Sequence, residues 1–479
     1  MKILLTGASG YIGSQLLPVL VGDGHRVVCG VRDPSRFNPP GSLISRIDII
    51  RLDLLDEQSF NNIPDDIDGA YYLVHSMAGT KDFAHLEITS AVNFREGLKK
   101  TNVRHVIYLG GIINDNNLSE HLLSRKRVEE ELAAGDYNFT SLRAGIIIGS
   151  GSASFEIIRD LVEKLPIMVT PEWLNTRCQP AGIADVLEFL SGCIFNRKTY
   201  NRQFDIGGPD ILTFKEMLIE YAKIRGLKRK IIPVPVMTPK LSSYWLYFIT
   251  STSYRLAATL VSSMKTEVVC SDQEINEILN IRPLSYRECL TRVFDKIEWS
   301  IFLFDWESSL SKGMLNPNMS DYVNVPTHGC FIYERRILIF DHQKIIEKLW
   351  SIGGESGWYY GNFLGRLRGI ADKLAGRGPD RERAGNPELN AGDKLDSWLV
   401  LFADKSEGRL VLYSEMKLPG EAWLEFKIQD NRLVQTSAFR PKGVAGRLYW
   451  YAMLPIHSLL FGGLLKRLTN YRAFAYGYQ

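Results

Sequence analysis

Short apolar runs alternate with amphipathic segments over the first 150 residues of the chain. A short apolar run between turn residues predicts a buried strand, and apolar positions three and four apart predict a helix. Alternation of the two is typical of a doubly wound parallel sheet, an α/β fold with helices on both faces. The predicted strands are residues 2–5, 26–31, 48–52, 70–75, 105–109 and 138–148, and the clearest helices are residues 12–21, 88–100 and 119–134.

The pattern becomes less regular after residue 150. Amphipathic helices are predicted at 155–165, 183–194 and 214–225, with a short strand at 203–206. We expect residues 151–300 to form a smaller lobe over the ligand edge of the sheet, completing a first domain at 1–300. Serine, asparagine, glycine and proline dominate around residues 308–325, which predicts a linker at 301–326.

The remaining residues, 327–479, predict a different order of elements. A strand at 329–340 precedes helices at 342–352 and 362–374 and a polar loop at 375–393. Four strands then follow in succession at 395–403, 409–416, 422–429 and 433–440, with a tight turn at Asp430-Asn431 and one long helix at 443–468. An antiparallel sheet with helices on one face is an α+β design.

A glycine-rich turn stands between the first predicted strand and the first helix. In this context a glycine fingerprint indicates dinucleotide binding. Gly7 permits the tight turn, Gly10 lets the backbone approach a pyrophosphate, and Gly13 lets the helix pack against the strand. The first amides of the helix then face the phosphates. The candidate phosphate-binding residues are Gly7, Ser9, Gly10, Tyr11, Ile12 and Gly13.

The amino-acid composition restricts the class of protein, but it says little about the fold. The 479 residues include 45% apolar and 23% charged residues, which is ordinary for a globular chain. A net charge of +3 offers no support for a nucleic-acid partner. The six cysteines form no Cys-x-x-Cys pair, so free thiols are favoured over disulfides, and we predict no metal site.

No segment is long and apolar enough to predict a membrane span. The N-terminal apolar run is too short for a signal peptide, and the most apolar segments, 244–263 and 449–465, are interrupted by charged or polar residues. We therefore predict a cytoplasmic protein. Peripheral contact with the inner membrane through these two amphipathic segments is left open as an alternative.

The residues after the second predicted strand bear on the choice of cofactor. An acidic residue there holds the ribose 2′-hydroxyl of NAD, and an arginine suits the 2′-phosphate of NADP. Arg32 and Arg36 favour NADP, since guanidinium groups pair well with phosphate, whereas Asp33 is the competing signal for NAD. Asp33 followed by Pro34 also fits the start of a helical turn. NADP is thus the predicted cofactor and NAD the less favoured one.

Polar residues also follow the third and fourth predicted strands. Asp53, beside Leu54, is placed to accept a hydrogen bond from the adenine amino group, or else it is a turn residue. His75, Ser76 and Met77 end the fourth strand at the edge where open α/β sheets bind ligands. His75 either lines the cofactor or donates to backbone in the core.

Four segments together resemble the NmrA-like, atypical branch of the short-chain dehydrogenase/reductase superfamily. They are the Gly7-to-Gly13 turn, Val31-Arg32-Asp33-Pro34, Tyr72-Leu73-Val74-His75-Ser76-Met77 and Tyr108-Leu109-Gly110-Gly111. The resemblance covers residues 1 to about 300 and implies an NAD(P)-binding Rossmann fold. Typical members carry a Tyr-x-x-x-Lys pair on the helix after the fifth strand. By the resemblance, His121 occupies the tyrosine position and Arg125 the lysine position.

That replacement changes the expected chemistry. In the superfamily the tyrosine donates a proton to the substrate carbonyl oxygen, and the lysine lowers the pKa of the tyrosine and holds the nicotinamide ribose. A histidine can donate a proton near neutral pH, and an arginine can hold ribose hydroxyls although it does not titrate. The alternative is that His121 and Arg125 are structural, on an amphipathic helix whose Arg127, Glu129 and Glu131 face solvent.

The C-terminal residues resemble an uncharacterised domain family that often follows an NmrA-like domain in bacterial proteins. The resemblance rests on Gly357-Trp358-Tyr359-Tyr360, Leu367-Arg368-Gly369, the segment from Glu415 to Leu424 and Leu448-Tyr449-Trp450-Tyr451. The element order is similar to the START-like, polyketide-cyclase-like helix-grip fold, which implies an apolar cavity under the last helix. The candidate lining residues are Trp398, Trp423, Phe426, Tyr449 and Trp450, and core packing is the alternative.

Two functions follow from these patterns. The first is an NADP(H)-dependent reductase, or an epimerase-like relative, acting on a lipophilic carbonyl compound held partly by the C-terminal domain. The second is a non-catalytic NADP(H)-binding sensor, assembly or regulatory protein, favoured by Gly110-Gly111 and the missing tyrosine. The resemblance of the C-terminal residues also implies a small apolar or lipid-like ligand.

Overall fold

The computed structural model describes residues 1–37, 39–75, 83–114, 120–234, 266–295, 298–299, 323–352, 389–395 and 397–469. The chain divides into two units: the first contains residues 1–295, and the second contains residues 296–299 and 322–479. Within the second unit, β14 (Glu298–Trp299) pairs with β15 (Val323–Asn324), so two residues of the predicted linker form a strand.

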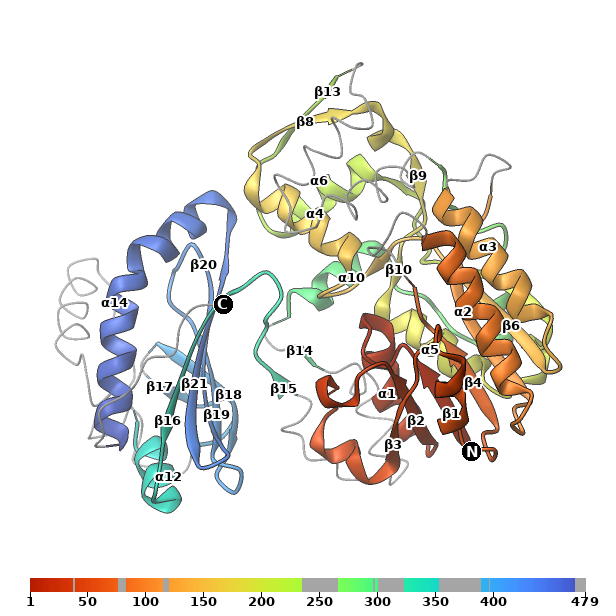
Figure 1. The fold of residues 1–479 in the computed structure, drawn as a ribbon. Coiled ribbons are helices and arrows are strands. Elements are labelled where there is room, and N and C mark those ends of the chain that lie inside the picture. The colour runs from red at the N-terminus through yellow and green to blue at the C-terminus, as the bar shows by residue number, and fades with distance from the viewer. Residues whose placement is uncertain are drawn as a thin grey trace. The chain divides into compact units, whose positions relative to one another are not determined.

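A seven-stranded parallel sheet forms the centre of the first unit (Figure 1). The strand order is β11-β6-β5-β4-β1-β2-β3, so successive strands extend outward in opposite directions from the β1–β4 pair. This pair is the topological switch point, where open α/β sheets bind ligands. The strands are β1 (Lys2–Thr6), β2 (Arg26–Val31), β3 (Ile47–Arg51), β4 (Gly69–Tyr72), β5 (His105–Gly111), β6 (Asn138–Ala144) and β11 (Arg202–Ile206).

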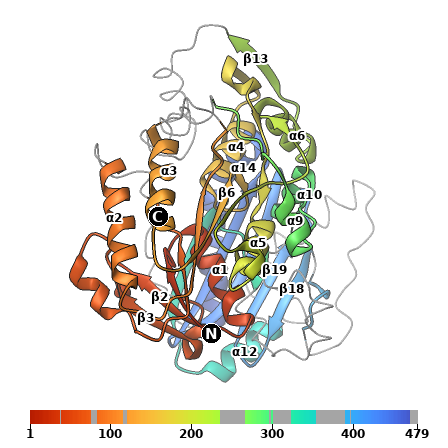
Figure 2. The ribbon, with the colours of Figure 1, turned by 90° about the vertical axis from the view of Figure 1, so that its right-hand side faces the viewer.

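Helices cover both faces of this sheet, as the alternating pattern predicts. On one face α1 (Tyr11–Gly22) and α5 (Ile183–Cys193) pack over Ile3, Leu5 and Ile107. On the other, α2 (Phe83–Leu98) and α3 (Glu120–Ala133) lie side by side over Leu4, Tyr72 and Val106 (Figure 2). Strand residues alternate between the two cores because successive side chains point to opposite faces.

The predicted smaller lobe has a core of its own. The lobe is built on α4 (Ala153–Lys164), α6 (Phe214–Ile224) and α10 (Tyr286–Val293), whose apolar faces meet around Phe155, Met217 and Leu290. Its other elements are β8 (Ile167–Pro171), which pairs with β13 (Lys230–Val234), and β9 (Arg177–Cys178), which pairs with β12 (Leu212–Thr213). The short helix α9 (Glu274–Leu279) instead packs Ile275 into the core of the central sheet. Short 3-10 helices among the described residues of the first unit are η1 (Pro34–Arg36), η2 (Gly41–Arg46), η3 (Glu57–Asn62), η4 (Glu172–Asn175) and η5 (Arg197–Thr199).

One predicted strand, 138–148, is wrong as a single element. The chain bends at Gly145, and β7 (Ile147–Ile148) leaves the central sheet to pair with β10 (Ala181–Gly182). The apolar run continues across the bend because both short strands are buried, so periodicity alone does not reveal the break.

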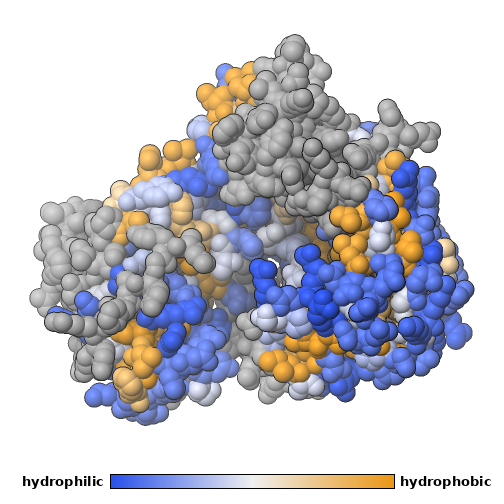
Figure 3. All heavy atoms as spheres, viewed as in Figure 1, coloured by the Kyte–Doolittle hydropathy of each residue, from blue (hydrophilic) through white to orange (hydrophobic). Residues whose placement is uncertain are grey.

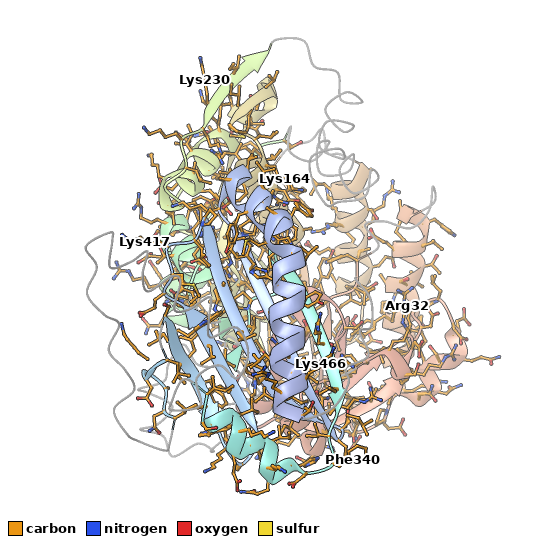
Figure 4. All side chains as sticks on the ribbon, turned by 90° about the vertical axis from the view of Figure 1, so that its left-hand side faces the viewer. Arg32, Lys164, Lys230, Phe340, Lys417 and Lys466 are labelled. Carbon is orange, nitrogen blue, oxygen red and sulfur yellow. The ribbon has the colours of Figure 1, made fainter. Side chains whose placement is uncertain are left out.

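The second unit is the predicted antiparallel sheet with a long helix. The strand order is β16-β21-β20-β19-β18-β17, and α14 (Gly443–Thr469) lies across one face together with α12 (His342–Trp350) (Figure 4). The strands are β16 (Phe331–Leu338), β17 (Lys394–Leu395), β18 (Trp398–Asp404), β19 (Arg409–Ser414), β20 (Gly420–Gln429) and β21 (Arg432–Pro441). The predicted helix at 362–374 and most of the loop at 375–393 lie outside the described residues.

Of the five aromatic residues expected near a ligand under the last helix, one is on the wrong face. Trp423 alternates with Ala422 and Leu424, and it packs with Val411 and Ala438 on the sheet face opposite α14. Phe426 and Trp398 belong to the core under α14, and Tyr449 and Trp450 are part of that helix. Successive side chains of a strand point to opposite faces of the sheet. The prediction for Trp423 was wrong because it did not take account of which face that position occupies.

Figure 3 shows hydrophilic side chains over much of one face, with smaller hydrophobic patches between them. Within the described ranges, no helix is long and apolar enough to cross a membrane. Nor do the described residues include a group of three or more metal-binding side chains.

Candidate functional site

The glycine turn after β1 has the geometry that the fingerprint predicts. Gly7 has a φ of +76°, and a Cβ there would lie 2.6 Å from the carbonyl oxygen of Leu73. A Cβ on Gly13 would lie 2.2 Å from the carbonyl oxygen of Gly7, and one on Gly10 would lie 3.1 Å from the same oxygen. Both close contacts are with backbone, which cannot move aside, so only glycine fits at positions 7 and 13.

The same turn leaves the start of α1 open to an anion. Gly10 is the residue before the helix, and no described side chain caps it; its N–H donates to Gly7 O at 2.8 Å. The first-turn amides of α1 therefore point toward the switch point, where the helix dipole favours negative charge. Ser9 is exposed, Ile12 packs against the core, and the Tyr11 hydroxyl lies against Gly149.

After β2, the acidic residue is bound to its own turn while the two arginines are exposed. The Asp33 carboxylate accepts from Ser35 N at 3.1 Å and from Ser35 Oγ at 2.6 Å, capping η1. These hydrogen bonds, the hydroxyl first, lower the pKa of Asp33 despite its exposure. Arg32 and Arg36 both stand on the surface, and Figure 4 labels Arg32 there.

After β3, Asp53 is a turn residue, which is one of the two roles that the sequence allowed; the other was to accept a hydrogen bond from adenine. Its Oδ1 accepts from Leu55 N at 3.1 Å, and its own N–H donates to Ser59 Oγ at 3.0 Å. Leu54 is only 6% exposed and packs in the core under α2. Leu54 therefore has little side-chain surface for a ligand, although Asp53 keeps its position at the edge.

After β4, His75 reaches across to the next strand. Its Nε2 lies 2.9 Å from Leu109 O, and since a carbonyl only accepts, this nitrogen carries the proton. The ring also meets Tyr108 edge-on, with centroids 6.0 Å apart. The backbone role proposed for His75 is thus present, and it fixes the ring at the carboxyl edge of the sheet. Ser76 and Met77 lie outside the described residues.

Arg125 lies at the end of β5, as the lysine position of the superfamily implies. A Cβ on Gly111 would lie 3.4 Å from Arg125 Nη1, so the guanidinium passes directly over the strand end. Its Nε is buried and has no hydrogen-bond partner among the described residues. The Tyr108 hydroxyl donates to Arg125 O at 3.3 Å. His121 is in the first turn of α3, but its side chain lies outside the described residues.

The expectation that Glu129 faces solvent on this helix is wrong. Glu129 is 3% exposed, and its carboxylate accepts from Arg143 Nε at 2.9 Å and Ser141 Oγ at 2.6 Å on β6. Arg127 is exposed as expected, and Glu131 accepts from Arg95 on α2 at 2.7 Å. A charged residue on the buried side of α3 is stabilised only because β6 supplies its partners, which helical spacing cannot show.

These contacts bring the predicted residues together along one sheet edge. Gly7 contacts the strand end at Leu73, His75 joins β4 to Leu109 on β5, and Arg125 covers Gly111. Sequence reasoning missed Glu87, which is 5% exposed and accepts from Ser124 Oγ at 2.6 Å between α2 and α3. No local pattern marks Glu87, because its partner is on another helix.

The residues at this edge fit a dinucleotide. The turn after β1 is a cradle that any Cβ at Gly7 or Gly13 would fill, and Arg125 Nε is a buried donor without a described partner. Residues 7–163 match the family described as NAD(P)H-binding. The first unit is an NAD(P)H-binding Rossmann domain.

The second unit matches a different family over residues 333–464, described as protein of unknown function (DUF2867). Together the two matches confirm the arrangement that both resemblances imply, with an NAD(P)H-binding domain followed by a separate antiparallel domain.

Curated relatives of the chain include two plant reductases. Divinyl chlorophyllide a 8-vinyl-reductase from Arabidopsis thaliana is 23% identical over 255 residues, which are 49% of this chain and 60% of that protein. The enzyme of the same name from Zea mays is 23% identical over 250 residues, 49% of this chain and 62% of that protein. The chain therefore spans less than two thirds of the length of these relatives.

Two solved structures share the fold of the NAD(P)H-binding domain. The NADPH-dependent quinone oxidoreductase of Escherichia coli, solved with NADPH, has a TM-score of 0.50 at 16% identity, over 61% of this chain and 100% of that one. The triphenylmethane reductase of Citrobacter sp., solved with NADP(H), has a TM-score of 0.50 at 13% identity, also over 61% and 100%. At these identities the likeness shows the fold alone.

Proposed function

We propose that the chain is an NADP(H)-dependent reductase acting on a lipophilic carbonyl compound. The observation that carries the proposal is the glycine cradle at the switch point, aligned along one edge with His75 and Arg125. The two plant relatives are named as reductases, which supports reduction over the epimerase-like alternative.

The preference for NADP over NAD rests on the residues after β2. An acidic residue that selects NAD accepts from the ribose hydroxyls, but Oδ1 of Asp33 already accepts two bonds from Ser35, which leaves Oδ2 alone for that role. Arg32 and Arg36 are exposed beside it, and a guanidinium suits a phosphate. The two arginines therefore offset the negative charge of Asp33 and favour a 2′-phosphate beside this turn.

The reduced nicotinamide would supply hydride to the substrate. Arg125 has donors directed over the end of β5, where they can hold ribose hydroxyls and orient the ring. His121, one turn earlier on α3, would supply the proton to the carbonyl oxygen, since an imidazolium donates near neutral pH. His75 would keep its ring on Leu109 O and help to fix the strand end.

Cofactor binding is the first test. NADPH should raise the melting temperature of the full chain more than NADH at equal concentration, because a ligand stabilises the state that binds it. Arg32→Ala should remove that difference, whereas Arg26→Ala, at the opposite end of β2, should preserve it. Equal shifts by both cofactors in the unaltered protein would contradict the assignment.

Turnover is the second test. NADPH oxidation, followed at 340 nm with a panel of lipophilic ketones, aldehydes and quinones, should fall about 10²-fold in His121→Ala if the histidine is the proton donor. His75→Ala is the matched histidine at the same edge, and it should change turnover much less. Unchanged turnover in His121→Ala would remove the histidine from the mechanism.

The second candidate function is NADP(H) binding without turnover. The replaced tyrosine and the Gly110-Gly111 strand end favour it, since neither glycine offers a side-chain donor. NADPH-dependent stabilisation with no oxidation on any substrate of the panel would favour this sensor function over the reductase.

A further inference from the structure

One edge of the antiparallel sheet is a long strand with an open side. β16 stands at the end of the strand order, and among the described strands only β21 pairs with it. Ile339 N donates to Asn431 O, directly opposite, at 2.9 Å, so every second residue before 339 also directs its backbone groups to β21. The N–H and C=O groups of residues 332, 334, 336 and 338 therefore point away from the sheet, where a further strand can bind them.

β16 has few of the features by which proteins protect such an edge. Edge strands are commonly very short, bulged, or marked by lysine or proline. β17, at the opposite end of the sheet, is two residues long and includes Lys394. β16 is eight residues long, keeps one register with β21 throughout, and contains neither lysine nor proline in its sequence, FIYERRIL. This edge can therefore accept a partner strand along its whole length.

The side chains on the outward-facing residues are exposed and largely apolar. Ile332 is 37% exposed and Leu338 is 50% exposed, on the face of the sheet away from α14. Phe340, which Figure 4 labels just beyond the end of β16, is 75% exposed. Between the apolar residues, Glu334 and Arg336 form an exposed ion pair at 2.6 Å. Apolar side chains beside an unpaired edge are typical of a surface that another chain covers.

The order of these side chains is self-complementary. If a second copy of β16 pairs antiparallel about a two-fold axis at Arg335, Glu334 of each copy lies opposite Arg336 of the other. Ile332 of each copy then lies opposite Leu338 of the other, and apolar cross-strand pairs are favourable. All four residues direct their backbone groups to the open edge. A shift of two residues would instead place Glu334 opposite Glu334, or Arg336 opposite Arg336.

Arg335 lies at the axis, but its side chain is on the other face of the strand. Its Nε donates to the Tyr333 hydroxyl at 2.8 Å, and its guanidinium carbon lies 5.1 Å from the centroid of the Tyr333 ring. The guanidinium also lies against Gly462 of α14. These contacts draw the charge toward its own strand and helix, which weakens the repulsion between two copies of Arg335.

We infer that β16 is the interface of a two-fold symmetric homodimer, in which antiparallel pairing joins the sheets of two copies into one. A second copy fits this edge because one strand supplies the apolar residues, both charges and the backbone groups in the order that the pairing requires. The interface is isologous, so each favourable pair occurs twice. The inference does not depend on NADP(H) binding, since every residue in it belongs to the second unit.

Sedimentation of the full chain at several concentrations tests the interface, and the unaltered protein should form a dimer. Glu334→Arg and Arg336→Glu should each raise the dissociation constant of the dimer by at least about tenfold, because each creates two like-charged pairs. Glu415→Arg is the matched control: it breaks the exposed pair with Lys394 on the opposite edge strand and should leave the dimer intact. A monomer at every concentration, or a dimer that neither substitution at the β16 edge weakens, would overturn the inference.

Mixing the two variants separates an interface from a folding defect. An equimolar mixture of Glu334→Arg and Arg336→Glu chains should recover the dimer, because every charged pair between the two different chains is again of opposite sign. A chain that carries both substitutions should dimerise alone for the same reason. A folding defect in one chain would not be corrected by the other. Failure of the mixture to dimerise would overturn the inference.

Discussion

Single glycines shape the carboxyl edge of the central sheet, because their backbone lies too close to other backbone atoms to leave room for a side chain. A Cβ on Gly13 would lie 2.2 Å from Gly7 O, and one on Gly7 would lie 2.6 Å from Leu73 O. The contact between Gly13 and Gly7 lies within one loop, so the spacing of the glycines in the sequence predicts it. The second joins the loop to β4, more than 60 residues away, and it depends on which strand lies beside β1.

Asp185 shows how burial sets the behaviour of a residue outside this edge. It is 3% exposed in the first turn of α5, and burial, ahead of all other causes, raises its pKa to about 6. Its Oδ2 accepts from Leu284 N at 3.1 Å. The protonated form is favoured in the folded protein more than in the unfolded chain.

The sign of the pH dependence follows from that shift. Between about pH 4 and pH 6 the folded protein binds more protons at Asp185 than the unfolded chain, so the free energy of unfolding decreases as pH rises through this window. The full cost of about 3 kcal/mol is present above pH 6. Asp185→Asn should therefore match the unaltered protein near pH 4 and exceed its stability by about that amount at pH 7. Urea unfolding at several pH values measures this difference, with the exposed Asp65→Asn as control; a difference independent of pH would contradict it.

At the scale of elements, local chemistry predicts most helix and strand positions. Capping boxes begin α6 and α10: Thr213 pairs with Glu216, and Ser285 with Glu288. Each box satisfies amides that the first turn of a helix leaves open. These signals lie within three residues of one another, and the predicted start at 214 agrees with the structure. The predicted start at 183 also agrees, although α5 follows Gly182 and no described side chain caps it.

The hairpin between β20 and β21 offers a direct test of one local signal. Asp430 and Asn431 have φ values of 50° and 56°, a left-handed pair that the predicted tight turn requires. Asn431→Gly should leave the free energy of unfolding within about 0.5 kcal/mol, because glycine adopts positive φ without strain. Asn431→Val should lower it by about 1–2 kcal/mol, because a β-branched residue cannot do so. Urea unfolding of both variants checks the pair, and equal stabilities would refute the turn geometry.

For the whole molecule, each unit has its own hydrophobic core. The central sheet buries residues with α1, α5, α2 and α3, and the antiparallel sheet buries a separate set with α12 and α14. Ligand binding should therefore stabilise one core more than the other.

Calorimetry of the full chain tests this division. We expect two unfolding transitions, of which NADPH raises only one. Gly13→Ala should identify that transition, because its Cβ overlaps Gly7 O and should abolish the NADPH effect on it. Gly145→Ala is the control, since its Cβ would have no neighbour closer than 3.5 Å. Equal movement of both transitions with NADPH would contradict separate stabilisation.

The sequence by itself determined the identity and order of the elements, the glycine turn and the division into two kinds of sheet. These depend on periodicity, capping and turn chemistry, which act between residues a few positions apart. Only the tertiary structure decided that Glu129 is buried against β6 and that Trp423 lies on the face away from α14. Burial and hydrogen bonding at Glu129 and Trp423 depend on strand neighbours and register, which are set by contacts between distant parts of the chain.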